Sequence, residues 1–445
     1  MERRDFLKTS LAGAAGLAVT GTGLNAKNFA AVKGANDKIK VGIVGFSDRC
    51  RSSLIPSFQL YAKELGFEIV AVSDIWKRRR DEAEKFFMDK YQQKVKTFRN
   101  NEELYDSKMC DAVIISTADF QHATHLIEAM IAGCDAYVEK PFAETMDDGR
   151  RALTAVQAAG KIVQIGSQRR SAPNYQAAHD FIQSGKFGDI TMVEMCWNVN
   201  QPGRWRRPEL VAQCFEKDTD WKRFLCNRPY EEWDPRKYLE YRLFWPFSSG
   251  IPGQWMSHQI DTVHWFTGYN HPRSVAANGG VYCWKDGRRN FDTITAVFDY
   301  GEGDKGFQLV YSSRMHNSAG GVKELYFSNG GSLNLDTNEV NSEGGLEQWA
   351  ADEMGMKANL LDTYTLPSIK VETSANTGSD PMTNLHMRNW MECVRSRKQP
   401  NAPVKAGYNH SIATIMCNAA LRTGEKVTFD EASQEVMAGG KVFRY

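Results

Sequence analysis

The sequence predicts an α/β protein with two domains, the first built on a parallel sheet and the second on a mostly antiparallel, open sheet. Up to about residue 168, short apolar runs typical of buried strands alternate with helix-like segments, which is the pattern of βαβ units. Beyond about residue 170, strand-like runs follow one another with few helices between them. A length of 445 residues is also more typical of two domains than of one. We therefore place the first domain at residues 36–168 and the second at 169–445.

Strands and helices of the first domain are expected to alternate regularly. The helix that follows Thr145 has its own start signal, because Thr145 and Asp148 resemble a capping box, and Gly160 ends it. The other helices are expected at 52–65, 77–91 and 122–133. The strands are apolar runs rich in β-branched residues, at 39–46, 67–74, 110–119, 134–142 and 161–168.

The second domain is expected to begin with a strand near 190–199. Asn329-Gly330-Gly331 is a good hairpin turn between two strands. Helical segments are predicted at 230–245, 253–267, 382–397 and 409–422, and residues 336–380 are predicted to be irregular.

Residues 1–30 resemble a twin-arginine export signal. Arg3-Arg4 precede Phe6-Leu7-Lys8 and an Ala/Gly-rich apolar stretch, Leu11 to Leu24. That stretch falls short of the about 20 residues that a membrane-spanning helix needs, so no membrane span is expected. Cleavage after Ala26, Ala30 or Ala31 would release a periplasmic protein; the alternative is a chance arginine pair in an ordinary N-terminus.

Charge and cysteine content exclude several classes of protein. The net charge of +1 provides no basic field for nucleic acid, so none is expected as a partner. The nine cysteines are odd in number, widely spaced and lack a C-x-x-C pair, so this is not a disulfide scaffold. Twin-arginine export moves folded proteins, which is compatible with thiols that stay reduced and buried.

A glycine turn at the end of the first strand is the first candidate for a binding site. In VGIVGFSDRC, Gly42 and Gly45 stand where a dinucleotide-binding turn needs them. Ser47 and Cys50 occupy the places of the second and third glycines of G-x-G-x-x-G. Both are small enough to allow close approach, and Ser47 has a hydroxyl for a phosphate. The motif is equally compatible with an ordinary tight turn.

Asp74 strengthens the prediction of a dinucleotide site. It ends the second strand, where an acid binds the adenosine ribose and favours NAD. Arg78 and Arg79 lie close by, so NADP stays open as the alternative, and Asp74 is also a plausible helix cap. Thr117 and His122, which follow a later strand, are expected to face the same crevice.

Two further patterns carry polar side chains suited to catalysis. The tripeptide Glu139-Lys140-Pro141 follows a strand end, where a lysine beside a nicotinamide can hydrogen-bond a reacting hydroxyl. On the helix predicted from GQWMSHQIDTVHWFTG, Gln254, His258, Asp261 and Trp265 share one face by their spacing. His258, Asp261 and His264 fan out around that helix, so no metal site is expected.

Together these motifs resemble the Gfo/Idh/MocA oxidoreductases. VGIVG, Asp74, AVIISTADFQHATHLIEAMIAG, EKP and the helix of His258 and Asp261 occur in the family's order, over about residues 38–430. The resemblance implies a Rossmann domain that binds NAD(P), and a second sheet that packs against the nicotinamide and often forms a dimer surface. It implies that the protein is a homo-oligomer, either a dimer or a tetramer.

The resemblance also assigns roles to residues. Lys140 matches the family's EKP lysine and His258 its acid–base histidine, whereas Gln254 stands where the family often has Asp. A glutamine side chain donates and accepts hydrogen bonds but carries no charge, so the assignment of proton transfer to His258 lacks the support of a neighbouring carboxylate. The candidate cofactor-binding residues are Gly42, Gly45, Ser47, Arg49, Asp74, Thr117, His122, Glu139, Lys140 and Gln168. The candidate substrate-binding residues are Arg169, Trp197, Arg242, Gln254, Asp261 and His386.

The function that the resemblance implies is hydride transfer between a tightly bound NAD(P) and a hydroxyl of a carbohydrate. Tight binding is expected because the periplasm has no free NAD pool, so the cofactor must be regenerated in place. One alternative is redox-neutral glycoside cleavage by oxidation, elimination, hydration and re-reduction. A second alternative is a non-catalytic sugar-binding protein on the same fold.

Overall fold

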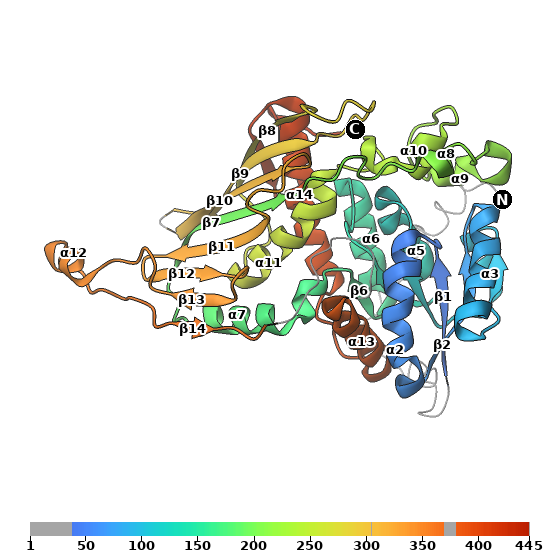
Figure 1. Ribbon diagram of the computed structural model, residues 1–445, viewed down its shortest axis with the longest axis horizontal. Helices are drawn as coiled ribbons and strands as arrows, with labels where there is room; N and C mark the ends of the chain where they lie inside the picture. The colour runs from blue at the N-terminus through green and yellow to red at the C-terminus, as the bar shows by residue number, and fades with distance from the viewer. Residues whose placement is uncertain (1–37, 304, 369–379, 445) are drawn as a thin grey trace.

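The computed structural model describes residues 38–303, 305–368 and 380–444 (Figure 1). The predicted export signal lies outside the described residues. Within the described ranges, no helix is both long enough and apolar enough to span a membrane.

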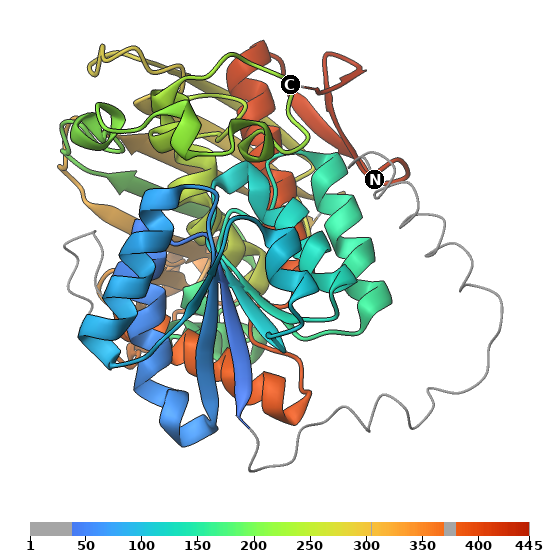
Figure 2. The same cartoon turned by 90° about the vertical axis from the view of Figure 1, so that its right-hand side faces the viewer.

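The first domain is a parallel sheet with helices on both faces (Figure 2). Its strands lie in the order β3-β2-β1-β4-β5-β6, and every pair in it is parallel. These strands are β1 (Ile39–Val44), β2 (Phe67–Ser73), β3 (Lys96–Phe98), β4 (Ala112–Ile115), β5 (Asp135–Val138) and β6 (Val163–Ile165). The helices are α2 (Ile55–Leu65), α3 (Lys77–Tyr91), α4 (Asn101–Asp106), α5 (His122–Ile131) and α6 (Met146–Ala159). The predicted fold class is therefore confirmed for this half.

Local sequence explains the regular elements of this domain. All four residues of β4 and of β5 are buried, as expected for strands covered on both faces. The Thr145 side chain accepts a hydrogen bond from the Asp148 amide, so the predicted start of α6 is confirmed. The short elements β3 and α4 were not predicted, although the Asn100 side chain caps α4 by accepting from the Glu103 amide.

The second domain is a larger, mostly antiparallel sheet. Its strand order is β14-β13-β12-β11-β7-β10-β9-β8-β15-β16-β17, with β7 and β10 paired in parallel. Ser328 pairs with Gly331, so the predicted hairpin turn at Asn329-Gly330 is confirmed. The strands are β7 (Ile190–Asn198), β8 (Ser274–Gly280), β9 (Thr293–Glu302), β10 (Lys305–Arg314), β11 (Val322–Ser328), β12 (Gly331–Asn334), β13 (Glu339–Asn341), β14 (Tyr364–Thr365), β15 (Val427–Asp430), β16 (Glu435–Ala438) and β17 (Lys441–Val442).

Helices lie between the second sheet and the first domain (Figure 1). They are α7 (Pro173–Gln183), α11 (Ser257–Thr267) and α14 (Val404–Thr423). Helix α14 packs against β8 on one side and against α6 and β6 on the other, which joins the two domains. The short helices α8 (Pro208–Val211), α9 (Trp221–Phe224) and α10 (Pro235–Leu239) belong to a long connection between β7 and α11.

Helix α13 (Pro381–Ser396) returns from the second half of the chain to the first domain. It packs against α2, and its Trp390 is fully buried with ring centroids 6.3 Å from Phe67 and 6.0 Å from Tyr137. Part of the first domain is thus covered by a helix whose residues lie well beyond residue 168. In the segment 336–380, predicted to be irregular, the described residues include β13, β14 and α12 (Gln348–Glu353).

Candidate active site

One large cavity, with a volume of about 1920 Å³, lies between the two domains. Its floor is formed by residues that directly follow β1, β2, β4 and β5, the edge at which open α/β sheets bind ligands. The predicted site residues that line it are Gly45, Ser47, Arg49, Asp74, Thr117, His122, Glu139, Lys140, Gln168, Arg169, Trp197, Arg242, Gln254 and His258.

The turn after β1 packs so closely on the neighbouring strand end that Gly45 has no room for a side chain. Gly45 has a φ of +85°, and a Cβ at this position would lie 2.6 Å from the Thr117 side chain. The Ser47 hydroxyl accepts a hydrogen bond from the Cys50 amide (3.2 Å) at the start of a short π-helical turn, Cys50–Leu54. Three features of this turn suit the pyrophosphate of a dinucleotide: the missing side chain at Gly45, the hydroxyl of Ser47 and the start of a helical turn at Cys50. Gly42 lies outside the cavity, where a Cβ would meet Cys110 Sγ at 2.8 Å.

Asp74 braces this turn and also lines the cavity. Its two carboxylate oxygens accept hydrogen bonds from the amides of Phe46 and Trp76, each at 2.9 Å. Burial raises the pKa of Asp74. Asp74 therefore orients both the glycine turn and the entry to α3, in addition to any contact with a ribose.

Lys140 projects from the end of β5 toward the second domain. Its Nζ donates a hydrogen bond to the backbone oxygen of Gln254 (2.7 Å). Burial lowers the pKa of Lys140 to about 8, although Glu139 and Asp119 oppose the change. The neighbouring Glu139 accepts from Arg49 Nε at 3.1 Å and is held as an anion.

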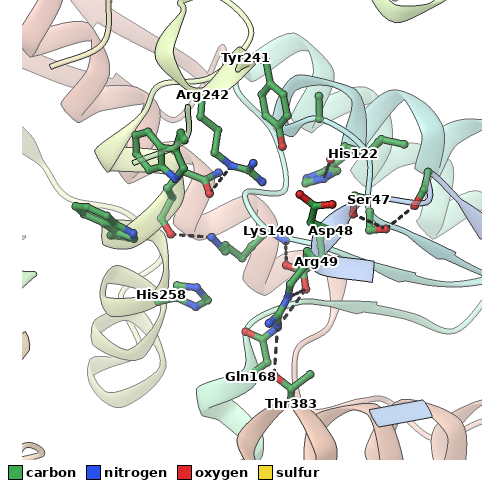
Figure 3. A pocket seen from close by; sticks show the side chains of 18 of the residues that line it. Ser47, Asp48, Arg49, His122, Lys140, Gln168, Tyr241, Arg242, His258 and Thr383 are labelled. Carbon is green, nitrogen blue, oxygen red and sulfur yellow. Dashed lines mark hydrogen bonds and ion pairs between the residues drawn. The ribbon is translucent and has the colours of Figure 1, made fainter. Parts of the chain in front are cut away.

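His258 faces Lys140 across the cavity (Figure 3). It lies in the first turn of α11 and stacks on the Trp197 indole, with ring centroids 6.0 Å apart. Burial, followed by the charges of Lys140, Arg169 and Arg49, lowers its pKa well below 6.5. His258 is therefore a neutral imidazole at pH 7 and can accept a proton.

Gln254 connects both sides of the site through a buried acid that was not predicted, Asp119. The Gln254 amide donates to Asp119 (2.6 Å), and its carbonyl oxygen accepts from Arg242 Nε (2.8 Å), so the amide has one orientation. Asp119 is 1% exposed and also accepts from Ser248 (2.7 Å). It lies in the short turn Asp119–Gln121 after β4, at the same edge of the sheet as Lys140 after β5, which is the signal that sequence reasoning missed.

Asp261 and His386 lie outside the cavity. Asp261 pairs with Arg170 (2.7 Å) and with His410 (3.5 Å) on α14. Burial opposes ionisation there, but Arg170 and His410 hold the pKa of Asp261 below its usual range. His386 is fully buried between the Ser171 hydroxyl and the backbone oxygen of Ile165.

Helix α11 is packed on several sides, which explains why its polar residues separate. His258 and Gln254 reach the cavity, Asp261 reaches α14, and Trp265 stacks on His179 with centroids 4.7 Å apart. Among the described residues, no cluster of His, Cys, Asp and Glu could hold a metal ion.

Comparison with known proteins places this geometry in a family. Residues 39–167 match the oxidoreductase family GFO_IDH_MocA, described as an NAD-binding Rossmann fold. The first domain is therefore similar to the NAD-binding domain of this family. Inositol 2-dehydrogenase of Salmonella typhimurium is 31% identical over 199 residues, which cover 43% of this chain and 56% of that protein. 1,5-Anhydro-D-fructose reductase of Ensifer adhaerens is 30% identical over 141 residues, covering 30% of this chain and 42% of the reductase.

The chain spans about half the length of the curated relatives it matches, whereas solved structures cover nearly all of it. The WlbA dehydrogenase of Bordetella pertussis, in complex with NADH and UDP-GlcNAcA, superposes with a TM-score of 0.64 at 18% identity, covering 89% of this chain and 99% of that one. Levoglucosan dehydrogenase, in complex with NADH and levoglucosan, gives a TM-score of 0.61 at 14% identity, covering 88% and 99%. The likeness in fold to these two dehydrogenases therefore extends beyond residue 167.

Proposed function

We propose that the protein is an NAD-dependent oxidoreductase that transfers a hydride between a tightly bound nicotinamide and a hydroxyl of a carbohydrate. The observation that supports this most directly is the pair Lys140 and His258, which face each other from two domains at the carboxyl edge of the Rossmann sheet. Relatives named as inositol 2-dehydrogenases and neighbours solved with NADH agree with this chemistry.

The two residues have complementary protonation states. When bound, NAD⁺ supplies the acceptor for the hydride, with its two electrons, that leaves the carbinol carbon. His258, neutral at pH 7, accepts the hydroxyl proton. Lys140, with a pKa of about 8, is mostly a cation at pH 7 and stabilises the developing negative charge on oxygen. The product is a carbonyl, and the reverse reaction uses the same groups.

NAD is favoured over NADP because the arginines near Asp74 already pair with carboxylates of the protein. Arg79 pairs with Asp48 and Glu82, both at 2.8 Å, and Arg78 pairs with Glu82 at 2.8 Å. A 2′-phosphate would have to compete with these carboxylates for the guanidinium groups.

Two alternatives to simple dehydrogenation remain within the same site. The cavity volume of about 1920 Å³ is compatible with redox-neutral cleavage of a glycoside. That volume can hold a dinucleotide together with a two-ring substrate. A non-catalytic sugar-binding protein would not need Lys140 and His258 to face each other across the cavity.

Location and assembly follow as proposals. The N-terminal sequence supports a periplasmic protein exported in the folded state, with its cofactor already bound.

Val297 on the outer face of the second sheet is 37% exposed, and Val310, Leu325 and Phe327 on other strands of that sheet are partly exposed. This apolar face supports a homo-oligomer, a dimer or a tetramer, formed through the second sheet.

Substitution of the opposed pair tests the proposed reaction. We expect Lys140→Ala and His258→Ala to lower kcat/KM by about 100-fold or more for any carbohydrate that reduces NAD⁺, since each removes a proton-transfer or charge-stabilising group. Absorbance at 340 nm measures turnover, and circular dichroism shows whether each variant is folded. His179→Ala is the matched control, because His179 stacks on Trp265 outside the cavity. Unchanged rates in folded Lys140→Ala or His258→Ala would contradict the assignment.

A further inference from the structure

We propose that the substrate carries a carboxylate near its reacting hydroxyl, and that Arg242 binds this carboxylate. The substrate is then a sugar acid rather than a neutral sugar. This inference rests on the proposed function and names the substrate class of the same site.

Arg242 is held in place with one side of its guanidinium left for a ligand. Its Nε donates to the Gln254 side chain (2.8 Å), and its guanidinium carbon lies 4.6 Å from the centre of the Tyr241 ring. In Figure 3 the guanidinium points into the cavity on the side of Lys140. Within the described parts of the chain, Arg242 donates its side-chain hydrogen bond from Nε, and neither terminal nitrogen donates one. A fixed planar fork of this kind matches the two oxygens of a carboxylate.

The carboxylates near this part of the cavity already interact with other residues of the protein. Glu139 is paired with Arg49, and Glu324 is paired with Arg169. Asp119 lies 4.0 Å from Arg242 Nε, on the side that already bonds Gln254, and it accepts two other hydrogen bonds. Lys140 makes no ion pair among the described residues, and its Nζ contacts a backbone oxygen. Within the described residues, Asp119 is the one carboxylate within ion-pair distance of Arg242, through Nε, and none lies within that distance of Lys140 Nζ.

The surroundings of His258 point in the same direction. The charged groups that act on its imidazole are Lys140, Arg169 and Arg49, and His410 lies on α14 behind it. Burial and these groups lower its pKa, which makes His258 a weak base in the free protein. A substrate anion beside Lys140 would offset the cations and strengthen the base when substrate is bound. A neutral sugar would have no such effect.

Matched substrate pairs test the inference. Purified protein with NAD⁺ is assayed with glucuronate against glucose, galacturonate against galactose, and the corresponding methyl glycosides, with glucose 6-phosphate as the phosphate arm. We expect the acid of at least one pair to be preferred by about 100-fold in kcat/KM, as is typical of a buried guanidinium–carboxylate pair. Arg242→Gln should lower kcat/KM far more for the acid than for the matched neutral sugar and so remove the preference, and Arg242→Lys should have an intermediate effect.

Controls separate failure of this inference from failure of the proposed function. Arg99→Gln is the matched control, since Arg99 is an exposed residue that pairs with Glu103 outside the cavity. Equal rates for acids and neutral sugars, both lowered alike by Arg242→Gln, would overturn the inference and leave the oxidoreductase intact. Preference for the phosphate would overturn the carboxylate assignment. If NADH binds but no sugar turns over, calorimetry of glucuronate and glucose binding to the NADH complex decides, and tighter binding of glucose contradicts the inference. A protein that binds no nucleotide would instead refute the proposed function.

Discussion

Lys140 and His258 owe their proposed roles to the environments in which the two domains place them. Both are half-buried beside other cations, and removal from solvent moves both pKa values downward, so that one remains mainly charged and the other neutral at pH 7. Sequence reasoning identified both residues and placed Gln254 beside them. It missed Asp119, because a single acid after a strand has no motif of its own.

The pH dependence of kcat/KM follows from these two groups. We expect an acid limb below pH 6.5, where His258 gains a proton, and an alkaline limb near pH 8, where Lys140 loses one. Asp119 raises the pKa of Lys140, so Asp119→Asn should move the alkaline limb to lower pH. Asn can retain the hydrogen bonds from Gln254 and Ser248, since both donate to one oxygen.

Initial rates of NADH formation from pH 5 to pH 10 measure both limbs. Asp81→Asn is the control, because Asp81 lies on exposed α3 and pairs with Lys77. If Asp119→Asn leaves the alkaline limb where it was, or moves it to higher pH, Lys140 is not the group that sets it.

Asp261 and His386 show where residue-level prediction fails. Spacing placed Asp261 on the face of His258, but α11 packs against α7, α14 and the turn Gln168–Ser171, so adjacent positions meet different neighbours. His386 lies on α13, whose buried face packs on the first domain. Helical periodicity identifies a face, whereas the partner of that face depends on contacts distant in sequence.

At the scale of elements, the turn between β1 and the following helix is the most constrained part of the site. Gly45→Ala should weaken NAD binding by about tenfold or more and lower the melting temperature, because the new methyl group would lie 2.6 Å from the Thr117 side chain. Gly160→Ala is the control for backbone strain alone, with a φ of +60° and nothing within 4 Å of the added carbon.

Fluorescence titration with NAD and differential scanning calorimetry distinguish the two effects. Both variants should lose about 1 kcal/mol of stability from the left-handed backbone, and Gly45→Ala should lose more. Equal NAD affinity in Gly45→Ala and wild type would show that this turn does not approach the cofactor.

Element prediction succeeded where local signals are strong. Strands β1, β2, β4, β5 and β6, the cap at Thr145 and the hairpin at Asn329-Gly330 depend on neighbours in sequence, and all were found. β3, with three residues, and α4, with six, are too short for periodicity to show. The return of α13 to the first sheet depends on contacts of Trp390 with residues more than 250 positions away, which one sequence does not reveal.

At the scale of the whole molecule, the cavity exists because the chain passes between the domains several times. Its walls come from strand ends of the first sheet, the connection before α11, and α11 itself. Helices α13 and α14 hold these parts together from the far end of the chain. A cofactor bound between both domains should dissociate slowly, which the proposed periplasmic location would require.

The nucleotide content of the purified protein tests this account most directly. The protein is denatured, and the released small molecules are quantified by absorbance and identified by mass spectrometry. We expect a nicotinamide dinucleotide, NAD rather than NADP, at close to one molecule per chain. Absence of any nucleotide, together with no binding of added NAD or NADP to the folded protein, would contradict the account and favour a non-catalytic role for the fold.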